Sequence, residues 1–171
     1  MAPHFPDTDA LAGVMIRQLR CFEDSRGWLT EFFRSDELDA SLLPAMGYLS
    51  QTKPGVSRGP HEHLDQSDQF FFPGPGVFLL GLWDNRNKSP TNGKRMVIEV
   101  GGKHPCSVII PPGVVHAYAC VSDMPGQVIN IPNRLYKGKD KADLIDEVRH
   151  EEDPTSPYVL DFAALVLERL G

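Results

Sequence analysis

Proline and glycine interrupt the chain at short intervals between positions 44 and 138, and the segments between them are short and rich in Val, Ile, Leu and Phe. This pattern is typical of many short strands joined by turns, as in a β-sandwich or β-barrel. We therefore expect an all-β fold. The expected strands cover residues 15–22, 27–33, 48–53, 69–72, 77–83, 95–100, 107–110, 117–121 and 127–131.

Two segments favour short helices at the edge of this fold. Residues 35–43 begin with Ser35 in a capping position, and residues 161–170 begin with Asp161 as a plausible cap. The charged segment 137–157 indicates a surface excursion. Because the 171 residues contain no internal repeat and no linker, we expect one domain over 1–171, with a barrel core at roughly 15–135.

The charge balance narrows the classes of partner. Seventeen basic against 23 acidic residues give a net charge of −6, and no block of Lys or Arg stands out. A nucleic-acid surface or an anionic membrane surface is therefore not expected. A phosphorylated small molecule is compatible with this charge, because one or two arginines can bind a phosphate bidentately.

The cysteines and the N-terminal residues indicate a compartment. Cys21, Cys106 and Cys120 are odd in number and form no C-x-x-C pair, which fits a reducing environment. Residues 1–13 lack a basic start followed by an apolar run, and no apolar stretch approaches about 18 residues. We expect a soluble cytoplasmic protein.

Two histidines one residue apart, His61 and His63, lie in the glycine-flanked stretch 55–76. On a strand, residues i and i+2 point to the same face, so the two imidazoles would lie side by side. The spacing of Gly55, His61, His63, Gln69 and Gly76 resembles the first motif of the cupins. Gln69 takes the position of the usual ligand glutamate, after a gap of five residues.

A second cupin-like motif, P-x-G-x-x-H, follows at residues 111–116 and ends in His116. The two motifs together imply a double-stranded β-helix, the cupin jelly-roll barrel, with short peripheral helices. The side chains expected to converge on the barrel interior are His61, His63, Gln69 and His116.

Within the cupins, residues 15–155 resemble the TDP-4-keto-6-deoxyhexose 3,5-epimerases of deoxysugar biosynthesis, the RmlC type. The resemblance rests on five stretches in the family's order: FEDSRGWLTEFFR, RGPH, WDNRNKSPTNGK, IPPGVVHAY, and LYKGKD with HEEDP. It implies a homodimer that acts on a dTDP-linked 4-keto-6-deoxy sugar without a redox cofactor. The reaction would be proton abstraction beside the sugar ketone.

The resemblance also implies roles for single residues. His61 matches the catalytic base, and a histidine suits this role because its pKa lies near the working pH. Arg58 matches the arginine that binds the diphosphate. Arg26 and Glu31 match residues that hold the nucleotide, partly across a dimer interface, and Gln51 matches a polar residue of the same pocket. His63 and His116 would shape the pocket.

The chain departs from the family at two catalytic positions. Gln69 stands where the family has a lysine that stabilises the enolate, and Asn130 stands where it has the tyrosine acid. Tyr136 matches a second tyrosine position and becomes the expected acid. For the aspartate that orients the base, Asp84 and Asp161 are the candidates.

Three alternatives stay open. The stretch TKPGVSRGPHEH also resembles the sugar-nucleotide 3,4-ketoisomerases, in which His61 and His63 would work together with Tyr48. A metal-dependent cupin, a dioxygenase or an isomerase, would hold one divalent transition metal with His61, His63, Gln69 and His116. A sugar-binding cupin without catalysis would explain the missing lysine and tyrosine.

Overall fold

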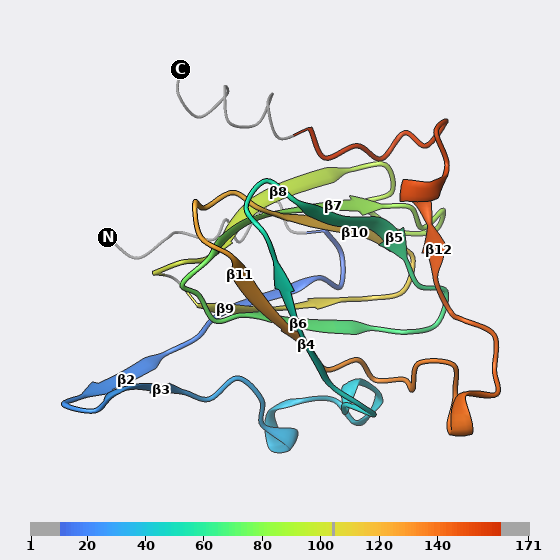
Figure 1. The fold of residues 1–171 in the computed structure, drawn as a ribbon. Coiled ribbons are helices and arrows are strands. Elements are labelled where there is room, and N and C mark those ends of the chain that lie inside the picture. Colours follow the sequence, from blue (N-terminus) through green and yellow to red (C-terminus); the bar gives the residue numbers. More distant parts are fainter. Residues whose placement is uncertain (1–10, 104, 162–171) are drawn as a thin grey trace.

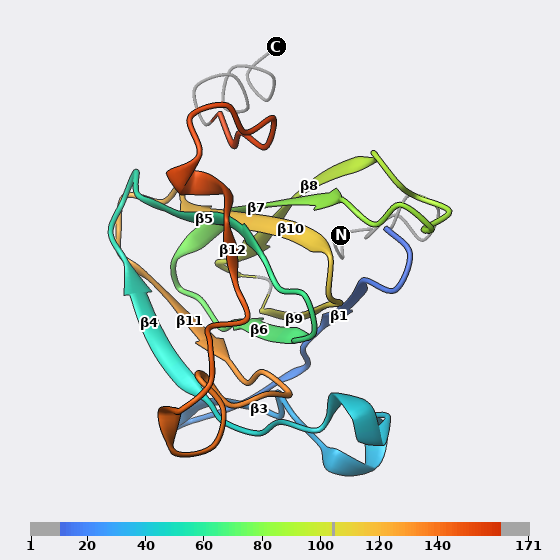
Figure 2. The ribbon, with the colours of Figure 1, turned by 90° about the vertical axis from the view of Figure 1, so that its right-hand side faces the viewer.

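The computed structural model describes residues 11–103 and 105–161. Two five-stranded antiparallel sheets form the body, with strand orders β1-β9-β6-β11-β4 and β12-β5-β10-β7-β8, and β2 and β3 form a separate hairpin. The two sheets face each other around one interior (Figures 1 and 2). The predicted all-β jelly-roll fold is confirmed.

The strand bounds are as follows. One sheet contains β1 (Met15–Gln18), β4 (Tyr48–Thr52), β6 (Asp68–Phe72), β9 (Cys106–Ile110) and β11 (Gly126–Asn130). The other contains β5 (Ser57–Glu62), β7 (Val77–Asp84), β8 (Arg95–Gly101), β10 (Val114–Cys120) and β12 (Val148–Arg149). The hairpin consists of β2 (Cys21–Asp24) and β3 (Gly27–Thr30).

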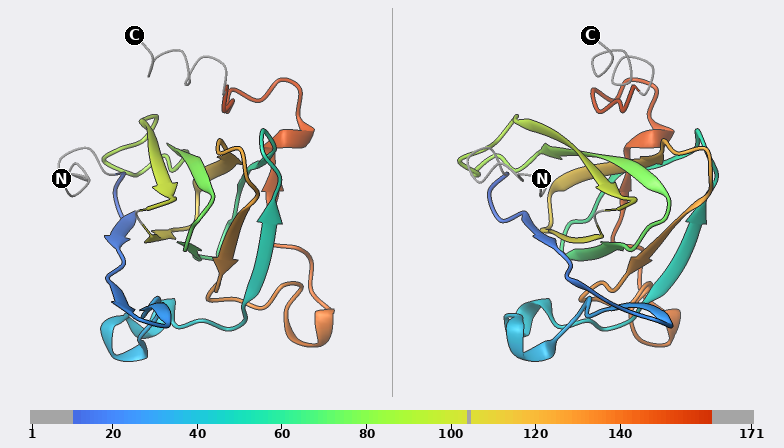
Figure 3. Two further views of the ribbon diagram at one scale, coloured as in Figure 1. Left: turned by 60° about the vertical axis from the view of Figure 1, so that its left-hand side comes forward. Right: turned by 90° about the vertical axis from the view of Figure 1, so that its left-hand side faces the viewer.

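Each expected strand overlaps an observed one. The differences in strand number and bounds arise from how the strands pair. The range 15–22 is two strands, because β1 pairs with β9 whereas β2 pairs with β3 in a hairpin that projects from the body (Figures 1 and 3). Strands β5 and β12 were not among the expected ones. Strand β5 carries few β-branched residues and is held between β10 and β12, and β12 lies within the segment expected to be a surface excursion.

The helix expected at 35–43 is absent. This segment forms two 3-10 turns, η1 (Ser35–Glu37) and η2 (Ala40–Leu42), and neither buries a residue, so no packing stabilises a longer helix. Asp39, not Ser35, acts as a cap, because its carboxylate accepts a hydrogen bond from the Ser41 backbone N–H. The helix expected at 161–170 lies outside the described residues, apart from Asp161.

In the described part of the chain, helical structure is limited to 3-10 turns, and none is long and apolar enough to cross a bilayer.

The apolar core fills the interior between the two sheets. Alternate residues of the facing strands point inward, and the rings of Phe72 and Phe78 lie 5.5 Å apart in its middle. Fully burying one such side chain contributes about 1.5–3 kcal/mol. The Phe70 ring lies 5.5 Å from the ring of His116, so the apolar core ends where a polar cluster begins.

After β11 the chain forms a long loop, residues 131–147, which includes η3 (Lys139–Lys141). The loop then runs across one end of the barrel to β12, which pairs with β5 (Figure 2). It therefore forms one wall of the space at that end.

Candidate active site

Four titratable side chains meet at the end of the barrel that the 131–147 loop covers. They are His61 on β5, His63 just beyond β5, Asp68 at the start of β6, and His116 on β10. One nitrogen or oxygen atom from each lies within 4.8 Å of the others. His61 and His116 are paired across β5 and β10, which places their ring centroids 4.4 Å apart.

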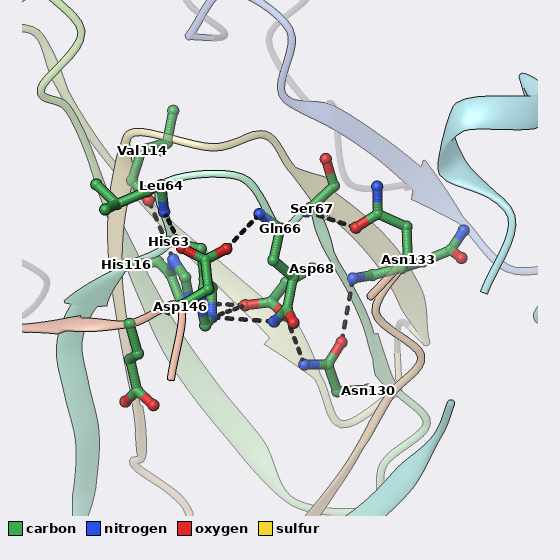
Figure 4. Close-up of polar contacts among 12 residues, drawn as sticks. His63, Leu64, Gln66, Ser67, Asp68, Val114, His116, Asn130, Asn133 and Asp146 are labelled. Carbon is green, nitrogen blue, oxygen red and sulfur yellow. Dashed lines mark hydrogen bonds and ion pairs between the residues drawn. The ribbon is translucent and has the colours of Figure 1, made fainter. Parts of the chain in front are cut away.

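Asp68 is the centre of this cluster (Figure 4). It is 1% exposed, and its Oδ2 atom lies 3.2 Å from His63 Nε2 and 3.1 Å from His116 Nε2. Its Oδ1 atom accepts hydrogen bonds from Gln66 Nε2 and Asn130 Nδ2, both at 2.9 Å. The carboxylate is therefore held from one side by amides and faces two imidazoles on the other.

Backbone carbonyls set the orientation of both imidazoles. His116 Nδ1 lies 3.1 Å from the Val114 carbonyl oxygen, and His63 Nδ1 contacts the Asp146 carbonyl oxygen. A proton on Nδ1 of each ring satisfies these carbonyls, so Nε2 of each ring is directed at Asp68. Within the described residues, Asp68 Oδ2 and His116 Nε2 are buried without a well-directed hydrogen bond, although they lie close together.

The local charges set the protonation states. Burial lowers the pKa of His61, and neighbouring His116 lowers it further, so the His61 ring is neutral at neutral pH. Burial also opposes a charge on His63, but the contact with Asp68 outweighs it and raises the pKa of His63 to about 9. Contacts with His116 and His63 outweigh burial at Asp68 and hold its pKa below the usual range.

A cavity of about 1340 Å³ opens beside the cluster. His61 and His63 lie in its wall, and so do Tyr48, Arg58 and Tyr136. The cations that line it are Arg58, Arg134, Lys137 and Arg149. A concave site with a few convergent polar groups and perturbed titratable residues is the usual form of a small-molecule site.

Arg58 is held in place at the cavity wall. Its Nε donates to Thr52 Oγ1 and its Nη2 donates to the Gln51 carbonyl oxygen, both at 3.0 Å. Gln51 therefore supports the cavity through its backbone, and it is not one of the residues that line it.

Asn130 connects Asp68 with a tyrosine of the cavity. Its side-chain amide donates to Asp68 Oδ1 and to the hydroxyl oxygen of Tyr48, each at 2.9 Å. Asn130 is almost fully buried, so it supports the cluster from behind.

The position expected for Gln69 is wrong. Successive residues of a strand point to opposite faces, so Asp68 enters the histidine cluster and Gln69 faces away from it. Gln69 lines a separate pocket of about 230 Å³, together with Phe32 and Leu38. The sequence contains the signal for Asp68, because a carboxylate follows H-x-H after a gap of four residues.

Other expected residues lie away from the cavity. Arg26 sits in the turn of the β2–β3 hairpin and forms an ion pair with Asp24 at 2.6 Å, and Glu31 lies 3.4 Å from Arg34. Asp84 is wrong as the partner of the base, because its carboxylate binds Arg86, Ser89 and Thr91. Asp161 is exposed.

Two carboxylates lie near His61. One is at the end of the 131–147 loop and the other follows β12. The side chains of Glu147 and Glu151 each place an oxygen within 4.8 Å of a His61 ring nitrogen. Sequence reasoning missed both, because their proximity to His61 depends on the path of the chain across the barrel.

Asp146 connects the 131–147 loop to the turn that follows β5. Its carboxylate accepts hydrogen bonds from the backbone N–H groups of Leu64, Asp65 and Gln66, at 2.8 to 3.0 Å (Figure 4). Its carbonyl oxygen contacts His63. One residue thus holds both the turn after β5 and the ring of His63.

The chain was compared with protein families and with known proteins. Residues 8–146 match the family model for dTDP-4-dehydrorhamnose 3,5-epimerase. A probable low-salt glycan biosynthesis epimerase of Haloferax volcanii is 38% identical over 128 residues, which are 74% of this chain and 81% of the relative. A spore coat polysaccharide biosynthesis protein of Bacillus subtilis is 35% identical over 126 residues, covering 72% and 81%.

A crystal structure of a dTDP sugar isomerase from Desulfovibrio desulfuricans superimposes with a TM-score of 0.76. The superposition covers 90% of this chain and 96% of the other at 23% identity, and it shows a shared fold.

Proposed function

The chain belongs to the dTDP-4-dehydrorhamnose 3,5-epimerase family, and we propose that it epimerises or isomerises a dTDP-linked 4-keto-6-deoxy sugar. The observation that carries this proposal is that His61 lies in the wall of a cavity that also holds Arg58. A base and a phosphate-binding cation in one cavity are what a nucleotide-linked keto sugar requires.

The chemistry is proton transfer next to a carbonyl. An unprotonated nitrogen of His61 takes the proton from the carbon beside the ketone. The C–H electron pair forms a C=C bond, and the carbonyl π pair moves to oxygen to give an enolate. Return of a proton to the opposite face of the same carbon restores the ketone and inverts the centre. No net oxidation occurs, so no redox cofactor is required.

Carboxylates support the base in this proposal. Glu147 and Glu151 lie near the His61 ring and take the place that Asp84 was expected to fill. Glu147 is the better placed of the two, because its side chain is 13% exposed and is therefore less screened by solvent. Glu147 also pairs with Arg149 at 3.2 Å, and we assign it as the residue that would orient the base.

A tyrosine of the cavity would return the proton. Tyr136 and Tyr48 both line it, and Tyr136 lies on the 131–147 loop. We assign Tyr136 as the acid for epimerisation. Tyr48 is the corresponding acid if the proton returns to a neighbouring carbon, as in ketone migration, and its hydroxyl is linked to the cluster through Asn130.

The dTDP group would lie against Arg58 in the wall of a cavity that is lined by both cations and carboxylates. Arg58 is oriented by Thr52 and would bind the diphosphate. Arg26 and Glu31 lie on and after the hairpin, outside the cavity, and they would bind the nucleotide of a partner subunit in a homodimer. Exposed apolar side chains of the hairpin support such an interface: Phe22 is 46% exposed, Trp28 54% and Leu29 62%.

We further propose a cytoplasmic location. The three cysteines form no disulfide, and Cys106 and Cys120 are buried, which is compatible with a reducing compartment.

Solvent exchange tests the function. The protein is incubated with dTDP-4-keto-6-deoxyglucose in deuterium oxide, and proton NMR follows the sugar C3 and C5 positions. We expect deuterium to enter at one or both carbons, and His61→Asn to slow this entry by about 10²–10⁴-fold. Binding of the nucleotide sugar without any exchange would overturn the enzymatic proposal and indicate a sugar-binding protein.

A further inference from the structure

Two hydroxyl groups in the cavity wall, those of Tyr118 on β10 and Ser50 on β4, have no part in the chemistry described so far. We propose that they bind an oxygen of the sugar-bound phosphate of the substrate, next to Arg58. Tyr118 would thereby be a residue that determines specificity for a diphosphate. This inference rests on the proposed function, because it concerns the same nucleotide-linked substrate.

The ring of Tyr118 is fixed in the apolar core. Tyr118 is 3% exposed, and its ring lies edge-on to three aromatic rings at centroid separations of 5.7, 5.8 and 5.6 Å, those of Phe70, Phe72 and Phe78. The hydroxyl end of the side chain reaches the cavity wall beside Ser50. A phenylalanine would fill the same apolar space, so packing alone does not account for the hydroxyl.

The hydrogen bonds of both hydroxyl groups are long. The Tyr118 hydroxyl oxygen lies 3.4 Å from Ser50 Oγ, and Ser50 Oγ lies 3.4 Å from the Val128 carbonyl oxygen. Hydrogen bonds between two oxygens are usually about 2.5–3.0 Å long. Because buried hydroxyls normally have well-placed partners, this pair keeps hydrogen-bonding capacity for a ligand in the cavity.

The Tyr118 hydroxyl is a neutral donor close to a cation. Burial raises the pKa of Tyr118, although the side chains of Ser50 and Thr52 and the charge of Arg58 act in the opposite direction. The hydroxyl therefore keeps its proton at neutral pH and can donate it to an anionic oxygen. Its interactions with Thr52 and Arg58 place it on the part of the wall that holds the guanidinium.

Strand pairing places Tyr118 beside Arg58 and His116 beside His61. On β5 the stretch 58–61 is one residue longer than the stretch 116–118 opposite it on β10, so the register shifts between the two pairs. An extra residue in a strand changes the face to which the next side chain points, and this allows Arg58 and His61 to line one cavity.

Gly59 makes this irregular stretch possible. Its φ is +78°, and a Cβ atom at this position would lie 2.5 Å from the carbonyl oxygen of His116. A strand rises about 3.3 Å per residue, so the two pairs are about 7 Å apart along β10. A sugar whose reacting carbon lies at His61 would therefore direct its phosphate toward Arg58 and Tyr118.

A phosphate oxygen suits the groups that meet here. Arg58 uses Nε and Nη2 to contact Thr52 and Gln51, and its Nη1 makes no hydrogen bond within the part of the chain that the structure describes. Tyrosine and serine hydroxyls are common donors to phosphate oxygens. Hydrogen bonds to an ionised acceptor are shorter and roughly twice as strong as those between neutral groups, so the phosphate would replace the long contact between Tyr118 and Ser50.

The test compares dTDP with dTMP, which lacks the second phosphate. Both nucleotides are titrated by calorimetry into the unaltered protein and into Tyr118→Phe, which removes the hydroxyl and keeps the ring. We expect the affinity for dTDP to fall by about 10–100-fold, as for other hydrogen bonds to a charged group, and the affinity for dTMP to stay the same. Ser50→Ala should act in the same direction.

Stability separates binding from a structural role. If the hydroxyl serves the fold, Tyr118→Phe lowers the urea midpoint and leaves the affinity for dTDP unchanged, which would overturn the proposal. If it serves binding, the urea midpoint is unchanged or higher, because a poorly bonded buried hydroxyl has been removed. Tyr158→Phe is the matched control, since Tyr158 packs against Trp83 and does not line the cavity. It should leave both affinities unchanged.

The other outcomes are also decisive. Equal losses for dTDP and dTMP, or a loss confined to dTDP-4-keto-6-deoxyglucose, would overturn the assignment to the phosphate. If circular dichroism shows that Tyr118→Phe fails to fold, Ser50→Ala decides. Unchanged affinity for dTDP with normal solvent exchange would overturn this proposal and leave the proposed function. A loss of dTDP affinity in Tyr118→Phe, without any solvent exchange by the unaltered protein, would do the reverse.

Discussion

The Oδ2 atom of Asp68 lies 3.1 Å from Nε2 of His116, and both side chains are almost entirely buried. An isolated buried charge is strongly unfavourable, and His116 and His63 on one side and the amides of Gln66 and Asn130 on the other stabilise the ionised Asp68. The same carboxylate faces Nε2 of both rings, whose Nδ1 atoms contact backbone carbonyls. Asp68 is therefore expected to affect both the stability of the fold and the arrangement of the histidines at the site.

We expect Asp68→Asn to lower the free energy of unfolding by about 3–5 kcal/mol, the usual cost of removing one partner of a buried ion pair. Urea denaturation measures this loss. Asp36→Asn is the matched control, since Asp36 pairs with Arg34 at an exposed site and should cost much less than Asp68→Asn. Similar losses in the two variants would contradict the assignment.

His61→Asn should lower the rate of solvent exchange at the sugar carbons by about 10²–10⁴-fold, because general-base catalysis contributes that much. Initial rates by NMR and the circular dichroism spectrum are the measurements. An unchanged rate in a folded variant would exclude His61 as the base.

Arg58→Gln should weaken binding of dTDP by roughly 10–100-fold, since a hydrogen bond to a charged group contributes about 1.5–3 kcal/mol. Calorimetric titration with dTDP measures this change. Lys88→Gln removes an exposed cation that does not line the cavity and should leave the affinity unaltered. Equal effects would mean that general charge, not Arg58, attracts the nucleotide.

Asn130→Ala should lower the free energy of unfolding by about 1–3 kcal/mol, because it removes a hydrogen bond to Asp68 Oδ1 and leaves the buried Gln69 N–H without its partner. Urea denaturation measures this loss. Asn133→Ala is the comparison, since Asn133 bonds the Ser67 N–H and the Ser41 carbonyl at a more exposed site and should cost less. Equal losses in the two variants would show that the carboxylate needs no support from Asn130.

Asp84 should make stability depend on pH in the acid range. Burial opposes its charge, but hydrogen bonds from Arg86, Ser89 and Thr91 outweigh it and lower its pKa in the folded protein. The unfolded chain therefore takes up a proton first, at about pH 3.9, and stability from this residue is present above that pH and lost below it. The difference in urea midpoint between the unaltered protein and Asp84→Asn should shrink from pH 7 to pH 3. A constant difference would refute this.

The sequence by itself determined the class of fold and most of the cluster. Short apolar segments between Pro and Gly predict strands because strand propensity and turn chemistry are local properties. The H-x-H spacing places His61 and His63 on one face, since side-chain alternation is local as well. The second motif predicts His116 at the same site, and the family resemblance predicts Arg58 as the residue that binds the diphosphate.

Tertiary structure decided which residue of each pair enters the site. Asp68 and Gln69 are adjacent polar residues, and only the pairing of β6 with β9 and β11 sets which of them points inward. A shift of register by one residue would exchange their faces. The contacts of Glu147 and Asp146 with the site likewise depend on a loop that crosses the barrel, and β5 exists as a strand because β10 and β12 flank it. Such long-range pairing has no local signal in the chain, which is why it had to be seen in the structure.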